Sequence, residues 1–351
     1  MSIFNGKKIT AQILGESHGE KLTMKVSGFP KFEFNADKLN EFTSRRKASN
    51  NAFSTPRKEA DTPLFNGIKN NVIDGDFTVE ILNTNVKSGD YNDLYGKPRP
   101  SHADYAWFKK DGALNFSGGG RFSARLTAPY CVLGGLCKQY LESKGIMVAG
   151  YLQSVGSVKG YSYLNGEPTY EEVINKTKAF PSLDKQEEMQ EEIKKARETG
   201  DSVGGVVELI VYNLPSGIGD NLFEGLEGKI SSLLFSIPAV KGVEFGAGFS
   251  MANALGSQVN DELYFDENGS LKLKTNNNGG INGGISNGFN LTIRVAIKPT
   301  PSISKEQNTI DLVNNVNTKI KINGRHDACV AVRAVPCLES AVMLAILDEV
   351  I

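Results

Sequence analysis

The 37 glycines of this 351-residue chain gather in short strings, several of which adjoin a regular apolar segment. The first string, GESHG at 15–19, follows a segment in which Ile9, Ala11 and Ile13 alternate with mostly polar residues. Such alternation is typical of a half-buried strand. Glycine adopts backbone angles that other residues resist, so the turn after this strand can lie close to a ligand. A surface turn with a solvated histidine is the plainer interpretation of this string alone.

A second string, GGG at 118–120, precedes an apolar segment at about 127–143 that we expect to be a helix. Pro129 fits only the first turn of such a helix. Backbone N–H groups before a helix start can point at an anion, and the helix dipole adds to the attraction. The string lacks both the Walker A and the dinucleotide-binding patterns. A plain flexible turn is the alternative.

The third string, at 276–288, holds five asparagines and five glycines and precedes a predicted core strand at 289–297. A flexible linker is one interpretation. Because Ile281 and Ile285 recur among the glycines, we favour a turn that approaches a flat or phosphorylated ligand.

Capping and periodicity signals predict the remaining elements. Asn35 is a candidate N-cap for a helix at 37–46 that buries Leu39 and Phe42. Further strands are expected at 22–26, 78–82 and 205–213, and further helices at 184–199 (exposed), 222–235 and 336–349. Periodicity alone therefore predicts only a mixture of α and β structure, with no repeat or clear domain linker.

Charge and cysteine usage exclude several classes of function. The formal net charge is −1, so no global field favours nucleic acid or an anionic membrane. The four cysteines contain no C-x-x-C pair, so we expect neither a metal site nor a redox motif, but free thiols in a cytoplasmic protein. No apolar run approaches the roughly 20 residues that span a bilayer.

Histidines and arginines supply the candidate chemistry. All three histidines, His18, His102 and His326, lie in polar, turn-like strings. Arginine binds carboxylates and phosphates through a planar fork. The arginines near these strings are Arg45, Arg46, Arg57, Arg99, Arg121, Arg125, Arg325 and Arg333. Together they predict a small, multiply anionic substrate, with histidines able to protonate a leaving group.

Other interpretations of these residues stay open at this point. The basic segment at 44–58 is also consistent with a solvated loop. Hydrolysis by a serine, histidine and aspartate fits the residue types, although Ser17 has no nucleophile-elbow pattern around it. An RNA-binding groove needs interleaved aromatic residues, and the basic segment contains only Phe53.

Nine strings, in order along nearly the whole chain, resemble the chorismate synthase family. They are GESHG at 15–19, TPRKEAD at 55–61, RPSHADY at 99–105, GGGRFSAR at 118–125, GDSVGGVVE at 200–208, SIPAVKGVEFG at 236–246, GGINGGISNG at 279–288, KPTPS at 298–302 and GRHDACV at 324–330.

The resemblance implies an α+β fold, a β-α-β sandwich of sheets and helices around one core, as a single domain over 1–351. It implies trans-1,4 elimination of phosphate from 5-enolpyruvylshikimate 3-phosphate to give chorismate, with reduced FMN, NADPH as a candidate reductant, and a homotetramer. A noncatalytic flavin- or phosphate-binding protein on the same scaffold is the alternative, and such a protein would be expected to have lost a proton-transfer residue.

The resemblance also implies roles for individual residues. His18 would donate a proton beside the flavin, His102 would protonate the departing phosphate, and Asp327 would relay the proton removed from the ring. The substrate would be held by Arg45, Arg46, Arg57, Arg125 and Arg333. Flavin contacts would come from Arg121, Phe122, Ser123, Pro238, Ala239, Gly283, Lys298, Pro299, Thr300, Pro301, Ser302 and Arg325.

Several positions depart from the family's pattern. Lys47 stands where a third arginine is usual, which keeps the charge but loses the planar fork. Phe122 replaces a serine, and the other departures are Ala52, Leu126, Ala328 and Val332. None of the three proton-transfer residues is lost.

Overall fold

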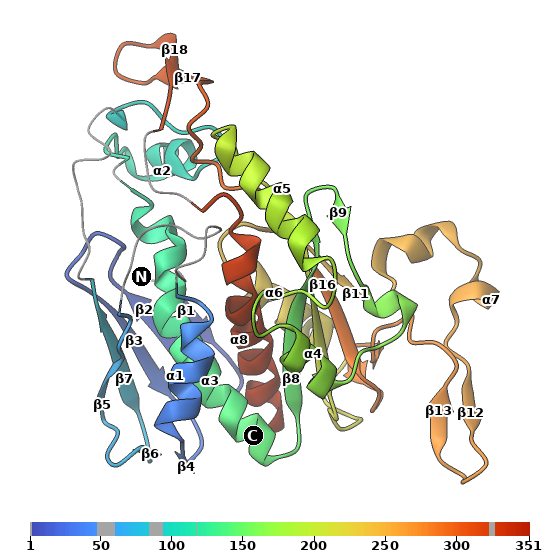
Figure 1. Ribbon diagram of the computed structural model, residues 1–351. Coiled ribbons are helices and arrows are strands. Elements are labelled where there is room, and N and C mark those ends of the chain that lie inside the picture. The colour runs from blue at the N-terminus through green and yellow to red at the C-terminus, as the bar shows by residue number, and fades with distance from the viewer. Residues whose placement is uncertain (1, 48–59, 84–93, 117, 323–326) are drawn as a thin grey trace.

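Two antiparallel five-stranded sheets enclose a layer of helices (Figure 1). The computed structural model describes residues 2–47, 60–83, 94–116, 118–322 and 327–351. The first sheet has the order β1 (Ser2–Asn5), β2 (Thr10–Leu14), β3 (Lys21–Ser27), β7 (Phe77–Leu82) and β5 (Leu64–Asn66). The second has the order β11 (Val240–Phe245), β16 (Leu291–Ile297), β10 (Gly205–Tyr212), β8 (Met147–Val155) and β9 (Val158–Lys159). The expected α+β sandwich is confirmed.

The helical layer is apolar because both sheets cover it. It consists of α1 (Ala36–Ser44), α3 (Thr127–Ser143), α6 (Leu226–Ser236) and α8 (Ala331–Val350). Leu133 and Leu136 of α3 and Leu338 of α8 are fully buried in a core cluster that also takes side chains from both sheets. Helix α1 begins as predicted, with the Asn35 side chain accepting a hydrogen bond from the Lys38 N–H.

The predicted strands around the first glycine string are confirmed. Strand β2 pairs with β3, from Thr10 opposite Ser27 to Leu14 opposite Thr23. The string at 15–19 therefore lies at the end of the β2–β3 hairpin.

Strand β10 is largely apolar, with Glu208 as its one charged residue, because both faces of its sheet are covered. Leu209 faces the helical layer, whereas Ile210 packs with Tyr151 on the opposite face, under α4 (Tyr170–Lys176). Its neighbour β16 runs to Ile297, so it delivers the KPTPS string to one end of the sheet.

Two helix predictions were wrong at their starts. The helix expected at 222–235 is a 3₁₀ turn, η5 (Leu222–Glu224), followed by α6, because Gly225 is extended and the Leu226 N–H donates to Gly284 instead. The helix expected from 336 begins at Ala331, which leaves Pro336 inside it. Ala331 and Val335 are fully buried, so packing rather than the local proline signal sets the start of this helix.

The third glycine string forms an ordered hairpin, β14 (Ile281–Asn282) and β15 (Ile285–Ser286), so the flexible-linker interpretation is wrong. The predicted exposed helix is α5 (Gln186–Glu198), which still buries Met189 and Ile193.

The remaining elements lie around the two sheets. They are β4 (Phe32–Glu33), β6 (Val72–Ile73), α2 (Asp104–Asp111), η2 (Gly120–Phe122), η3 (Ala124–Leu126), η4 (Tyr163–Asn165), η6 (Gly248–Asn253), α7 (Gly256–Val259), β12 (Leu263–Phe265), β13 (Leu271–Leu273), β17 (Gln307–Asp311) and β18 (Val316–Ile320). Among the described helices, none is long and apolar enough to cross a membrane.

Candidate active site

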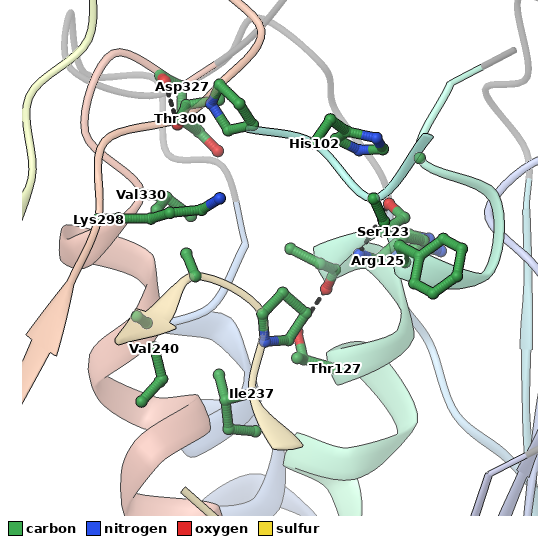
Figure 2. Close-up of a pocket in the computed structure, with 18 of the residues that line it drawn as sticks. His102, Ser123, Arg125, Thr127, Ile237, Val240, Lys298, Thr300, Asp327 and Val330 are labelled. Atoms are coloured by element: carbon green, nitrogen blue, oxygen red, sulfur yellow. Dashed lines mark hydrogen bonds between the residues drawn. The ribbon is translucent and has the colours of Figure 1, made fainter. Parts of the chain in front are cut away.

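A cavity of about 550 Å³ opens beside the N-terminal ends of α3 and α8. Its volume is typical of a small-molecule site. Figure 2 shows Lys298 and Asp327 on one side of it and Ser123 and Arg125 on the other, with Ile237 below. The predicted site residues that line it are His18, Arg46, His102, Arg121, Phe122, Ser123, Arg125, Pro238, Ala239, Lys298, Thr300, Pro301, Ser302, Asp327 and Arg333.

Five predicted residues are not among the lining residues. Arg57 and Arg325 lie outside the described part of the chain. Arg45, Gly283 and Pro299 are described but do not line the cavity. Gly283 lies in the β14–β15 turn, at the opposite end of β16 from the KPTPS string.

Two glycine strings meet at His18. Gly118 has a φ of +61°, and a side chain there would bring its first carbon within 1.9 Å of His18 Nε2. Only glycine therefore fits both the backbone angle and the contact. The Ser17 N–H donates to the Gly120 carbonyl over 3.3 Å, which fixes the first string against the second.

Ser17 is a lining residue that sequence reasoning did not assign to the site. Its side chain is 1% exposed, and within the described part of the chain its Oγ has no hydrogen-bond partner. A buried hydroxyl of this kind usually finds a partner in a ligand or water. The position of Ser17 next to His18 was the sequence signal that could have identified it as a site residue.

His102 is oriented by a buried ion pair. Its Nδ1 lies 2.5 Å from Oδ1 of Asp104, at the start of α2, and Arg99 holds the same carboxylate through Nε and Nη2 at 2.7 and 2.8 Å. Arg99 also donates to the Gly118 carbonyl over 2.6 Å. Burial raises the pKa of Asp104, but hydrogen bonds from Arg99 and His102 outweigh it and bring the pKa to about 2.

Asp104 was missed because helix α2 was not predicted and only His102 was given a role in the string at 99–105. The spacing R-x-x-H-x-D at 99–104 was the signal that could have found it. A carboxylate on Nδ1 fixes the ring and leaves Nε2 for the ligand.

Two buried arginines share one carboxylate at the cavity wall. Arg46 Nη1 lies 2.9 Å from one oxygen of Asp61, and Arg125 Nη1 contacts the other. Arg46 also donates to the Thr127 hydroxyl over 2.9 Å. These three charged groups carry one net positive charge, which attracts an anion more strongly in a buried site than in water.

A second ion pair forms the opposite wall. Arg333 Nη1 lies 2.8 Å from Oδ2 of Asp327, and its Nε donates to the Arg46 carbonyl over 2.9 Å. The Asp327 carbonyl accepts from Thr300 Oγ1 over 3.0 Å, which joins the KPTPS string to this wall (Figure 2). The Lys298 N–H donates to the carbonyl of Ala239, whose φ of 75° is unusual for a residue with a side chain.

Arg45 has a different environment from its neighbour. Its guanidinium forms two hydrogen bonds, of 2.6 and 2.9 Å, with Glu339 of α8, and Glu339 also accepts from the Gly150 N–H over 2.8 Å. This contact joins α1, α8 and β8. The substrate role that the resemblance gives Arg45 stays a prediction.

Aromatic residues form part of the cavity rim. The Arg121 guanidinium lies 4.6 Å from the centre of the Trp107 ring, and the Phe122 ring meets Trp107 edge-on at 5.5 Å. Trp107 was not predicted as a site residue, although its place near the end of the long irregular segment was visible in the sequence.

The comparisons with known proteins cover nearly the whole chain. The family model described as chorismate synthase matches residues 9–351. A chorismate synthase of Methanococcus aeolicus is 41% identical, covering 99% of this chain and 96% of the relative. A chorismate synthase of Dehalococcoides mccartyi is 39% identical, covering 99% and 96%. A crystal structure of a chorismate synthase matches with a TM-score of 0.72 and 25% identity, covering 98% of this chain and 92% of that one.

Proposed function

This chain belongs to the chorismate synthase family, and from that premise we propose how its cavity performs the family's reaction. The chain is a phosphate lyase of the shikimate pathway to aromatic amino acids, and its reaction eliminates phosphate from 5-enolpyruvylshikimate 3-phosphate to give chorismate. The family requires a reduced flavin. The observation that supports the proposal is the convergence of His18, His102 and Asp327 with the arginine pairs in one cavity.

The lining residues fit FMN as that flavin. The cavity offers cationic groups for a phosphate, the partly exposed Phe122 ring for a flat ligand, and the Ser17 hydroxyl, which has no hydrogen-bond partner within the described part of the chain. The FMN contacts that we propose within the cavity are Arg121, Phe122, Ser123, Pro238, Ala239, Lys298, Thr300, Pro301 and Ser302. Bound there in its reduced form, FMN supplies electron density that helps the carbon–oxygen bond to phosphate break.

The substrate's anionic groups would be held by the arginines of the two walls. Among the described residues, Arg46 and Arg125 together carry more charge than Asp61 balances, which favours a carboxylate or phosphate, and Arg333 extends this surface to the opposite wall. Because these guanidiniums are already fixed by Asp61 and Asp327, they need little reorganisation as charge develops on the leaving phosphate.

Proton transfer would fall to three residues. His102 protonates the departing phosphate through Nε2, because Asp104 engages Nδ1 and supports the charged ring. Asp327, on the opposite wall, relays the proton that leaves the substrate ring. His18 donates a proton on the flavin side, where the absence of a side chain at Gly118 leaves room for the imidazole ring.

We also propose a homotetramer in the cytoplasm. The exposed apolar side chains Phe249 and Phe265, on the arm that carries β12 and β13 (Figure 1), support an assembly. The four free cysteines support a reducing compartment. NADPH remains the candidate reductant for the flavin.

The experiment that tests this function is phosphate release from 5-enolpyruvylshikimate 3-phosphate, without oxygen and with dithionite-reduced FMN. Release that depends on protein and on reduction of the FMN is the expected result. Release no faster than a protein-free blank would overturn the proposal. Oxidation of NADPH in the presence of FMN, followed by absorbance, tests the reductant separately.

A further inference from the structure

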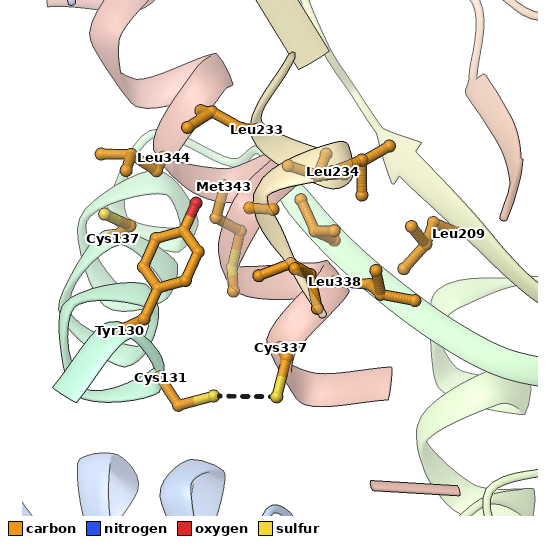
Figure 3. Close-up of a cluster of buried hydrophobic side chains, with 14 of the residues drawn as sticks. Tyr130, Cys131, Cys137, Leu209, Leu233, Leu234, Cys337, Leu338, Met343 and Leu344 are labelled. Carbon is orange, nitrogen blue, oxygen red and sulfur yellow. Dashed lines mark hydrogen bonds between the residues drawn. The ribbon is translucent and has the colours of Figure 1, made fainter. Parts of the chain in front are cut away.

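Two thiols face each other beneath the cavity. Cys131 of α3 and Cys337 of α8 place their sulfur atoms 3.6 Å apart, with the Cys131 thiol donating (Figure 3). Both side chains are buried, and both helices are fixed in the core between the two sheets. The elimination described above uses neither thiol.

Only Cys337 of the two also lines the cavity. It therefore has an approach route for a small polar molecule, whereas Cys131 lies behind it. Cys131 is consequently placed to react with Cys337 but not with a molecule in the cavity. This division between an accessible and a resolving cysteine is the arrangement that redox-sensing pairs use.

The charges around Cys337 favour its thiolate. The hydrogen bond from Cys131 lowers the pKa of Cys337 to about 6 despite burial, and Arg46, the Thr127 hydroxyl and Arg333 act in the same direction. Asp61 pairs with Arg46 and Asp327 with Arg333. These carboxylates weaken the effect of the two guanidiniums on the pKa of Cys337 but do not cancel it. Burial raises the pKa of Cys131 well above its ordinary value, so Cys131 is the protonated member of the pair.

We propose that Cys337 and Cys131 form a peroxide-reactive pair, in which hydrogen peroxide entering the cavity oxidises Cys337 and Cys131 then closes a disulfide between α8 and α3. In the first step the Cys337 sulfur attacks one peroxide oxygen, the O–O bond breaks, and a sulfenic acid and water result after proton transfer. In the second step the Cys131 sulfur attacks the Cys337 sulfur, the S–O bond breaks, and water leaves with the Cys131 proton. The two thiols are oxidised by two electrons, and one peroxide is reduced to two waters.

The disulfide requires the sulfur atoms to approach from 3.6 Å to about 2.05 Å. This approach moves α3 and α8, whose N-terminal ends border the cavity. We therefore expect oxidation to slow turnover, and a dithiol to restore it by exchange. The effect on turnover rests on the proposed function, whereas the crosslink does not.

The first test uses the unaltered protein. Limiting iodoacetamide is applied between pH 5 and 9, and the modification of each cysteine is followed by peptide mass spectrometry. We expect Cys337 to react at least about tenfold faster than Cys137 at pH 7, with a half-maximal rate near pH 6. Cys137 is the matched control, because it is buried on α3 like Cys131 and burial raises its pKa. Equal rates at the two sites would overturn the proposal.

The second test adds hydrogen peroxide to the full chain and maps its disulfides. A Cys131–Cys337 crosslink that dithiothreitol reverses is expected, and Cys137→Ser should form it as readily. Cys131→Ser should stop at a sulfenic acid on Cys337 that dimedone traps. A protein that shows no Cys131–Cys337 crosslink, or that oxidises Cys137 or Cys329 first, would contradict the proposal even if the Cys131→Ser variant failed to fold.

Discussion

Arg45 and Arg46 are neighbours in sequence, yet they belong to two ion-pair regions that differ in charge balance. Arg45 meets Glu339 between α1 and α8, one cation against one carboxylate. Among the described residues, Arg46 and Arg125 share the carboxylate of Asp61 at the cavity wall, two cations against one carboxylate. The balanced pair joins α1 and α8, whereas we propose that the unbalanced cluster of described residues binds an anionic ligand. On this proposal, charge balance separates structural from ligand-binding arginines where residue type does not.

The largest effect is expected from the cavity's acid. Changing His102 to alanine removes the group that protonates the leaving phosphate, so turnover should fall by about 10²- to 10⁴-fold while FMN still binds. Phosphate release measures the first quantity, and the absorbance change on flavin titration measures the second. Near-normal turnover would remove the role assigned to His102.

Substitution in the balanced pair of Arg45 and Glu339 should lower the stability of the protein. Replacing Arg45 by methionine leaves the carboxylate of Glu339 buried without its cation, and we expect a loss of about 3 kcal/mol in the free energy of unfolding. Urea denaturation measures it. The paired change of Arg45 to Met with Glu339 to Gln is the control, and it should recover part of the loss. An unchanged denaturation midpoint in Arg45→Met would contradict a structural role.

An intermediate effect is expected from Asp104, which positions His102 rather than touching the substrate. Asp104→Asn should lower kcat by roughly 10- to 100-fold with little change in KM, because the amide no longer supports a charged imidazole. Nitrogen NMR of the protein, which has only three histidines, reports the altered His102 tautomer. An unchanged His102 spectrum would show that Asp104 has only a structural role.

The smallest effect is expected at the rim. Phe122→Ser removes the edge-on contact with Trp107. Such contacts contribute about 0.5–1.5 kcal/mol, so FMN affinity should weaken by roughly 2- to 10-fold. Flavin titration of the unaltered protein and of Phe122→Ser measures the two dissociation constants. Tighter FMN binding by the variant would show that Phe122 does not help to hold the flavin.

Sequence reasoning predicted the parts of the fold that local patterns encode. Apolar patterning identified β2, β3, β7, β10 and β16, and Asn35 identified the start of α1. Element starts failed where tertiary contacts override local signals, as at Pro336 inside α8 and Gly225 before α6. The pairing of the sheets depends on contacts between distant residues, which one sequence does not show.

The candidate site shows the same division between what local motifs predict and what depends on contacts between distant residues. The motif strings identified His18, His102, Asp327 and most of the lining residues, because each motif carries its own reactive group. They could not separate Arg45 from Arg46, since the partners Glu339 and Asp61 come from elsewhere in the chain. Ser17, Asp104 and Trp107 were missed because their roles depend on what lies next to them in space.

The most direct test of the charge-balance argument is substrate affinity in two matched variants, Arg125→Met and Arg45→Met, each removing one guanidinium. Calorimetric titration with 5-enolpyruvylshikimate 3-phosphate, with oxidised FMN present, measures the dissociation constant without turnover. Arg125→Met should weaken binding by at least about tenfold, whereas Arg45→Met, at a temperature where it remains folded, should stay within about twofold of the unaltered protein. Equal losses in the two variants, or a larger loss in Arg45→Met, would contradict the assignment of ligand binding to the unbalanced cluster.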